Sequence, residues 1–260
     1  MKRGDVFKIY THEDTPVLLA GVLGMQVTKL YLMPEVTIPQ KKLEKFIAFY
    51  NRRLRGEPVA YILGYKYFMG RKFLVGKSVL IPRPETEILV KLVLSEIGTT
   101  SGTRVIDVGT GSGCIAISLQ LAKPDLQVTA VDVSQSALVL ARKNAVKLHS
   151  KIKFQQSNLL KNVIESFDIY VANLPYVPRK DYSHLQAGLK FEPKNALVSP
   201  RSDDWLIFEL LRQVTAHNKQ ALVLLEIDPS YTTQIKKHFP QAKFYKDFQG
   251  FIRFCKIPIS

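Results

Sequence analysis

From residue 83 onward, short apolar runs alternate with longer amphipathic runs, and this alternation constrains the fold more than any other feature. Runs such as "TRVIDVG", "QVTAVDV" and "FDIYVAN" have the β-branched composition of strands, while "CIAISLQLA" and "WLIFELLRQVTA" have helical spacing. The pattern predicts an α/β fold, a mostly parallel sheet covered by helices on both faces. The tail "KFYKDFQGFIRFCKI" predicts two last strands around a Gln-Gly turn, which places an antiparallel strand at one side of the sheet. Ligands bind beyond the carboxyl ends of the strands in such sheets, so a functional site is expected there.

The first 82 residues have a different hydrophobic pattern from the rest of the chain. Residues 1–55 show helical spacing, and one face of the run "KKLEKFIAFYNRRL" carries four apolar side chains, Leu43, Phe46, Ile47 and Tyr50. Residues 56–82 carry Val, Ile, Tyr and Phe interrupted by glycines, which is typical of a hairpin. We therefore expect a small helical domain at 1–55, a β-hairpin linker at 56–82 and a larger domain at 83–260.

The first strand end carries three closely spaced glycines. In "VIDVGTGSGCIAISL", Gly109, Gly111 and Gly113 lie between a strand and a helix, where they permit a tight turn and let a ligand approach bare backbone. Asp107 precedes the loop. Asp132 ends the next strand, and a carboxylate there can accept hydrogen bonds from both hydroxyls of a ribose.

The spacing G-x-G-x-G differs from the dinucleotide pattern G-x-G-x-x-G and leaves no third glycine for a pyrophosphate. We interpret the loop, with Thr110 and Ser112 between its glycines, as a site for S-adenosylmethionine, which has no phosphate to bind. A nicotinamide site is one alternative. The other is a structural turn with a capping aspartate.

The third strand end, in "FQQSNLL", would lie beside the adenine of such a cofactor. Ser157, Asn158 and Leu159 are candidates for the rim of the adenine site. A polar loop after any strand has the same composition, so a plain loop is an equal alternative.

The fourth strand ends in the tetrapeptide "NLPY", Asn173 to Tyr176. Its position would face the methyl group of the cofactor. An amide or aromatic amine nitrogen is a poor nucleophile, and acceptors for both of its N–H groups would hold it and favour the positive charge of the transition state. The Asn173 side-chain carbonyl and the Leu174 backbone carbonyl are the candidate acceptors, and Asn173 is also a candidate cofactor-binding residue. Pro175 would stiffen the loop, and Tyr176 would stack on the planar group or exclude water; a turn with a half-buried aromatic is the alternative.

The composition of the chain limits which cellular compartment and which classes of partner are expected. The chain of 260 residues has a net charge of +15 from 37 basic and 22 acidic residues, which fits either a polyanionic partner such as RNA or a lysine-rich solvated surface. Its two cysteines, Cys114 and Cys255, form no metal-like cluster, so a reducing, cytoplasmic setting without a metal is expected. The N-terminal apolar run is short and follows acidic residues, unlike a secretory signal. No apolar stretch approaches the roughly 20 residues that span a bilayer.

The chain resembles the HemK/PrmC family, the release factor glutamine methyltransferases, over nearly its whole length. The similar segments are "RRLRGEPVAYILGYKYFMGRKFLV", "LIPRPETEILV", "VIDVGTGSGCIAISL", "ANLPYVP", "FEPKNAL" and "KDFQGFIRF". The second and fifth segments are specific, whereas many methyltransferases share the glycine loop.

This resemblance implies a Rossmann-like class I methyltransferase domain with a seven-stranded, mostly parallel sheet, an N-terminal helical substrate-recognition domain and a β-hairpin linker. It also implies methyl transfer from S-adenosylmethionine, leaving S-adenosylhomocysteine, to the glutamine side-chain amide in the Gly-Gly-Gln loop of class I release factors. The cofactor residues of the family correspond to Gly109–Gly113 and Asp132, and its substrate-binding tetrapeptide to Asn173–Tyr176. We expect a monomer that acts on this protein substrate without a membrane and without a need for direct nucleic-acid binding.

Several positions depart from the family pattern. Leu174 replaces the usual proline; because only its backbone carbonyl is needed, the chemistry should survive, although the loop loses one fixed φ angle. Asn158 replaces an aspartate and Leu159 a bulky aromatic, and both changes bear on adenine packing. Asp228 stands where a glycine is common, which leaves the detail of that strand end open.

Two further segments have open interpretations. Glu192 and Pro193 in "FEPKNAL" either brace the active-site loop or form a surface turn. In "PRPETE", Arg83 and Glu85–Glu87 either border the cofactor cleft or only begin a helix, since Pro84 suits a first turn and acids there suit the helix dipole.

Three functions remain to be separated. The first is glutamine methylation of a release factor, or of a ribosomal protein. The second is methylation of adenine amino groups in RNA or DNA, because rRNA adenine dimethyltransferases use the same "NLPY" and adenine N6 presents the same planar N–H pair. The third is a non-catalytic cofactor-binding or adaptor protein, against which the intact Asn173 and loop glycines argue.

Overall fold

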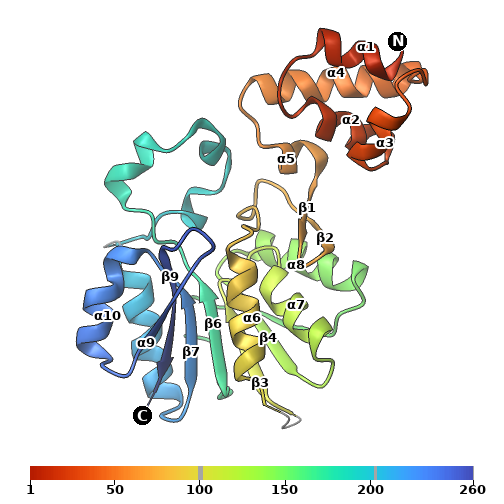
Figure 1. Cartoon of the computed structure of the whole chain (residues 1–260). Helices are drawn as coiled ribbons and strands as arrows, with labels where there is room; N and C mark the ends of the chain where they lie inside the picture. Colours follow the sequence, from red (N-terminus) through yellow and green to blue (C-terminus); the bar gives the residue numbers. More distant parts are fainter. Residues whose placement is uncertain (99–101, 202–203, 260) are drawn as a thin grey trace. The chain divides into compact units, whose positions relative to one another are not determined.

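The computed structural model of the chain describes residues 1–98, 102–201 and 204–259 (Figure 1). The chain divides into two compact units. The first comprises Met1–Tyr65 together with Gln186–Phe191, and the second comprises Lys66–Leu185 and Glu192–Ser260. The residues 56–82 that we expected to form a separate linker are thus shared between the two units.

The first unit is helical. Its elements are α1 (Arg3–Ile9), α2 (Thr15–Leu23), α3 (Val27–Leu32), α4 (Gln40–Leu54) and α5 (Val59–Leu63). Helix α4 is the one predicted from "KKLEKFIAFYNRRL". It buries Leu43 and Phe46 in the core of the unit, and Ile47 and Tyr50 pack against that core half-buried. The apolar face predicted from the spacing is therefore the face by which α4 packs against the core of the first unit.

Residues 59–63 correct the prediction of a hairpin throughout 56–82. The β-branched and aromatic residues of "VAYIL" favour a strand, yet they form α5. The helix begins after Pro58, whose carbonyl accepts from the Ile62 N–H at 3.1 Å, and ends at Gly64 with a left-handed φ of 78°. Burial of Ile62 in the core of the first unit outweighs the local preference. The hairpin is shorter than predicted, with strands β1 (Tyr65–Phe68) and β2 (Arg71–Leu74).

The second unit holds a seven-stranded sheet, as predicted, in the order β5-β4-β3-β6-β7-β9-β8. The strand β9 pairs antiparallel with both β7 and β8, and the other neighbours are parallel. The strands are β3 (Arg104–Val108), β4 (Gln127–Asp132), β5 (Lys153–Gln156), β6 (Ile169–Asn173), β7 (Leu222–Glu226), β8 (Lys243–Lys246) and β9 (Ile252–Pro258). This is the Rossmann-like arrangement of class I methyltransferases that the sequence resemblance implied.

The sheet is buried on both faces, and successive residues of one strand face different cores. On β6, Ile169 and Val171 belong to the core formed with α6 and α7, while Tyr170 and Ala172 belong to the core formed with α9 and α10 (Figure 1). The helices of this unit are α6 (Thr86–Glu96), α7 (Cys114–Ala122), α8 (Gln135–Lys147), α9 (Trp205–His217) and α10 (Thr232–His238). The helical spacing of the sequence predicted α7 and α9, whereas the seven residues of α10 are too few for a clear period.

Short 3₁₀ segments fill the connections after β6 and β7, at Arg179–His184, Ala187–Phe191, Lys194–Ala196 and Pro229–Tyr231. Among residues 1–98, 102–201 and 204–259, no helix has both the length and the apolar character required to cross a bilayer.

A buried amide joins the hairpin to α8 and to the glycine loop. Asn144 on α8 is fully buried, and its Oδ1 accepts from the Leu74 N–H at 2.7 Å. Its Nδ2 donates to the carbonyls of Leu74 at 3.0 Å and Ser112 at 2.9 Å. One side chain therefore satisfies the end of β2 and a residue of the glycine loop.

We predict that Asn144→Ala lowers the free energy of unfolding by about 2–4 kcal/mol, because it leaves buried backbone groups without partners. The exposed neighbour Lys143 provides the control, and Lys143→Ala should change stability by less than about 0.5 kcal/mol. Urea denaturation followed by circular dichroism measures both. Equal stability of the two variants would contradict a structural role for Asn144.

Candidate active site

A cavity of about 710 Å³ is lined by the residues that follow β3, β4, β5 and β6. Its volume lies within the range of about 300–1,000 Å³ that small-molecule sites occupy. The predicted site residues that line it are Gly109, Thr110, Gly111, Ser112, Asp132, Ser157, Asn158, Leu159, Asn173, Leu174 and Pro175. Gly113 and Tyr176 are the predicted residues that do not. The strand ends thus bring together most of what the sequence singled out, as the rule for parallel sheets predicts.

Asp107 fixes the glycine loop by accepting hydrogen bonds. This side chain is fully buried, and its Oδ2 accepts from the Thr110 hydroxyl at 2.6 Å and from the Ala116 N–H at 3.2 Å. Burial raises the pKa of Asp107 to about 7, against the lowering effect of these two hydrogen bonds. The carboxyl group therefore joins the loop to the first turn of α7.

The three glycines have different reasons to lack a side chain, although all have left-handed φ angles, 78°, 53° and 80°. A Cβ at Gly109 would lie 3.1 Å from Leu174 Cδ2, and one at Gly113 would lie 3.0 Å from Ile117 Cδ1. A Cβ at Gly111 would meet no atom within 4 Å, because Gly111 faces the cavity. A side chain at Gly109 or Gly113 would thus crowd a neighbouring side chain, whereas Gly111 leaves room for a ligand.

Asp132 ends β4 at the cavity, opposite the glycine loop. Its Oδ2 accepts from the Gly111 N–H at 2.9 Å and its Oδ1 from the Ser134 N–H at 2.8 Å. Burial is the largest effect on this carboxyl group and raises its pKa above the usual value. Each oxygen retains a lone pair beyond these bonds, so the group can still accept from a diol. Ser134 caps α8 by accepting from the Ala137 N–H at 3.3 Å.

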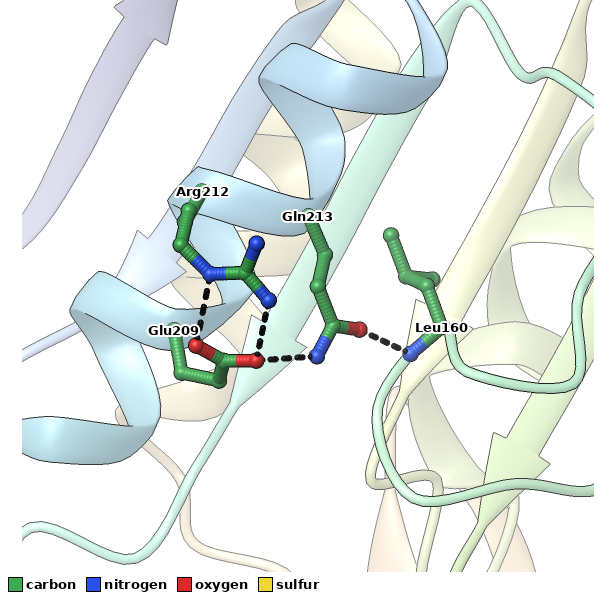
Figure 2. A network of polar contacts seen from close by, with 4 residues as sticks. All are labelled: Leu160, Glu209, Arg212 and Gln213. Carbon is green, nitrogen blue, oxygen red and sulfur yellow. Dashed lines mark hydrogen bonds and ion pairs between the residues drawn. The ribbon is translucent and has the colours of Figure 1, made fainter.

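The loop after β5 is fixed by a polar network on α9 (Figure 2). Gln213 accepts from the Leu160 N–H at 2.8 Å and donates to Glu209 at 2.6 Å, and Arg212 donates twice to the same carboxylate. These donors hold the pKa of Glu209 at about 2. The preceding residue, Leu159, has a left-handed φ of 53° and lines the cavity. The network therefore fixes a backbone conformation that leucine rarely adopts.

Asn173 ends β6, and its amide is oriented by residues of two other elements. Its Nδ2 donates to Thr86 Oγ1 at 3.1 Å, and the Thr86 hydroxyl donates to Glu226 Oε2 at 2.8 Å. Glu226 is the register partner of Asn173 on the adjacent strand β7. Burial, opposed by the hydrogen bonds from Thr86 and Tyr176, raises the pKa of Glu226 to about 7.

Leu174 and Tyr176 differ from what the sequence led us to expect. Leu174 contributes more than its backbone, because its buried side chain packs in the core and lies over Gly109. The Tyr176 hydroxyl donates to Glu226 Oε1 at 3.4 Å, and its ring packs against the core, so it does not border the cavity. The Tyr176 carbonyl accepts from the Tyr231 hydroxyl at 2.9 Å, which fixes the end of the tetrapeptide.

Glu192 braces the segment that precedes α6. Its side chain is 2% exposed and accepts from Arg83 at 2.6 Å and from the Ile81 N–H at 2.9 Å. Glu192 is therefore buried rather than part of a surface turn, but the contacts of its side chain are with Ile81 and Arg83 and not with the tetrapeptide loop. In "PRPETE", Arg83 and Thr86 line the cavity, while Glu87 accepts from the Met69 N–H of the hairpin turn at 2.7 Å.

Comparison of the sequence with known proteins identifies the family to which the chain belongs. Residues 85–192 match the family model "Methyltransferase small domain" and residues 11–64 the model "PrmC N-terminal domain". The release factor glutamine methyltransferase of Koribacter versatilis is 37% identical over 257 residues, 92% of this chain and 91% of its own length. The enzyme of the same name from Chlorobaculum tepidum is 42% identical over 197 residues, 71% of this chain and 67% of its own length.

The chain belongs to the release factor glutamine methyltransferase family. Its fold also recurs at low sequence identity. A solved structure of the T. thermophilus 16S rRNA N2 G1207 methyltransferase with AdoMet and guanosine has a TM-score of 0.54 at 16% identity, over 75% of this chain and 50% of that one. This second likeness concerns the fold alone.

Two residues of this release factor glutamine methyltransferase family member contact the tetrapeptide in a way that the sequence did not predict. The sequence pointed to Thr86 only as part of the open segment Glu85–Glu87, and it did not point to Glu226. Glu226 is a charged residue within the apolar run "LVLLEI". A charged residue in a buried strand is unusual and could have indicated a functional position. Thr86 has no such signal, because a threonine in the first turn of a helix is ordinary. Its link to Asn173 is visible only once α6 and β6 are placed side by side.

We predict that the melting temperature of the ligand-free protein falls as the pH rises from about 4 to 7, and that Asp107→Asn reduces this fall. Asp107 has a higher pKa folded, about 7, than unfolded, 3.8, so the folded state binds more protons in this window and loses stability as the pH rises. Asparagine does not titrate but can still accept from Thr110 and Ala116. Differential scanning calorimetry at several pH values measures the difference. The exposed Asp125→Asn is the control, and its curve should follow that of the wild type.

Proposed function

We propose that this protein transfers a methyl group from S-adenosylmethionine to the side-chain amide nitrogen of the glutamine in the Gly-Gly-Gln loop of class I release factors. The observation that carries the proposal is the oriented amide of Asn173, which shares one cavity with the Gly111 backbone and the Asp132 carboxylate. Family membership supports the same substrate, because the curated relatives bear the name release factor glutamine methyltransferase.

The residues of the cavity fit S-adenosylmethionine. Gly111 presents bare backbone to open space, and Asp132 can accept from ribose hydroxyls. Leu159 and Asn158 offer an apolar and a polar edge for the adenine. The bound cofactor would supply a methyl group on a positively charged sulfur, which needs no further activation. The T. thermophilus methyltransferase of the same fold binds AdoMet, in agreement with this assignment.

The tetrapeptide would bind the acceptor. Asn173 Oδ1 and the Leu174 carbonyl would accept from the two N–H groups of the glutamine amide and hold its nitrogen in line with the methyl group. As that nitrogen gains positive charge, both acceptors stabilise it. The nitrogen then loses one proton, and the product is a secondary amide. Alignment of this kind can contribute on the order of 7–11 kcal/mol to lowering the barrier.

The direct test is transfer of labelled methyl groups to a purified class I release factor, to ribosomal protein, to rRNA and to DNA. We expect label in the release factor, and mass spectrometry should place an added methyl group on the glutamine of the Gly-Gly-Gln peptide. Label in rRNA or DNA with none in the release factor would establish the adenine alternative instead.

We predict that Asn173→Ala lowers kcat by about 10²–10³, the loss typical of removing one preorganised hydrogen-bonding group from a transition state. Cofactor affinity, measured by isothermal titration calorimetry, should stay within about twofold, since in this scheme the amide oxygen of Asn173 acts on the acceptor and most of the cofactor contacts come from the glycine loop and Asp132. A kcat near that of the wild type would contradict the assigned role.

Asp132→Ala should weaken S-adenosylmethionine binding by about tenfold or more, because a bidentate acceptor for the ribose is lost. Isothermal titration calorimetry measures the affinity. Asp125→Ala on the exposed surface is the control. Unchanged affinity of a folded Asp132→Ala variant would exclude the ribose contact.

A further inference from the structure

We propose that Thr86 and Glu226 are positioning residues. They set whether the oxygen or the NH₂ group of the Asn173 amide points toward the methyl acceptor. This inference rests on the proposed function, because it assumes that Asn173 accepts from the substrate amide. The three side chains come from α6, β6 and β7 and form one chain of hydrogen bonds.

The orientation follows from counting protons. The Thr86 hydroxyl has a single proton, and an ionised Glu226 can only accept, so that proton lies on the 2.8 Å bond to Glu226 Oε2. Thr86 Oγ1 must then accept at its contact with Asn173, 3.1 Å away, which requires the Nδ2–H₂ group there. The Asn173 oxygen is left to accept from the substrate. The opposite orientation would set two oxygens against each other without a proton between them.

The geometry around Glu226 keeps this chain fixed. Glu226 is 3% exposed, and its register pairing with Asn173 places both residues at the same level of the sheet. Its second oxygen accepts from the Tyr176 hydroxyl at 3.4 Å. Rotation of this buried carboxylate would break the hydrogen bonds at both of its oxygens, so its orientation is fixed.

Protonation of Glu226 would remove the preference. A neutral carboxyl can donate to Thr86, which frees the Thr86 proton for the Asn173 oxygen and permits the flipped amide. A flipped Asn173 presents N–H groups to the N–H groups of the acceptor, which is unproductive. Burial and the negative charge of Glu85 raise the pKa of Glu226, while Thr86, Tyr176 and Arg253 lower it, with a net value of about 7. Turnover should therefore rise with pH through this region.

The kinetic test compares Thr86→Val, which keeps the shape but loses the hydroxyl, with Thr86→Ser, which restores it. We expect Thr86→Val to lower kcat about tenfold, the effect of one lost hydrogen bond, with cofactor affinity unchanged. Thr86→Ser should recover at least half of the wild-type rate. Thr129→Val, at a buried threonine of β4 away from the cavity, is the matched control and should have wild-type kcat. A wild-type kcat for Thr86→Val would overturn the proposal.

The pH profile adds a measurement that a purely structural role would not change. In the wild type, kcat should rise between pH 6 and 8, and Glu226→Gln should flatten this rise because the amide does not titrate. A profile of Glu226→Gln with the same slope as the wild type would overturn the proposal.

A third measurement does not depend on the substrate. In protein labelled with ¹⁵N-asparagine, the Asn173 side-chain signals are those missing from Asn173→Ala. Their chemical shifts should titrate with Glu226, with a midpoint of about 7, and should lose this titration in Thr86→Val and Glu226→Gln. Failure of the proposed function would appear as no methylation of the release factor by the wild type, with this titration still present. Failure of the positioning role would appear as methylation by the wild type with no titration of Asn173.

Discussion

The hydrogen bonds that Asp107 accepts from Thr110 and Ala116 are the interaction on which the site depends. Asp107 has no exposure to solvent, so the partners of its Oδ2 come from the protein itself, from the glycine loop and the first turn of α7. The same device recurs at Asp132 and Glu226, at the ends of β4 and β7. Each carboxylate holds a loop or side chain that the sheet alone would leave free to move.

The parallel sheet decides which of these groups meet. Because β3, β4, β6 and β7 run in one direction, their carboxyl ends share one edge, and register sets Asn173 beside Glu226. Residues 86, 173 and 226 are far apart in the sequence but adjacent at that edge. The helix α6 supplies the third member because it covers the face of the sheet at β6 and β7. The chemistry is therefore distributed over the chain, and the fold assembles it.

Most of the fold and part of the site were predictable from the sequence, for definite physical reasons. Periodicity and turn residues predicted the sheet and its major helices, since burial on one or two faces imposes those patterns. The glycine loop and Asp132 were predictable because a tight turn and a strand-end carboxylate are local features. The short helix α5 was not, because tertiary burial of Ile62 overrode its local preference. The Thr86–Asn173 contact was not either, since it joins residues 87 positions apart through packing alone.

The three loop glycines would not be lost at the same rate if selection for activity were relaxed. A side chain at Gly109 or Gly113 would both strain the left-handed backbone and crowd a neighbouring side chain, so selection for stability alone would act against replacing them. Gly111 faces open space, and a side chain there would cost the fold only the strain of a left-handed backbone while filling part of the cavity. In a lineage that kept this protein only as a scaffold, position 111 would be the first of the three to drift. Its identity is thus a marker, readable from sequence, of whether a descendant still keeps this part of the cavity open.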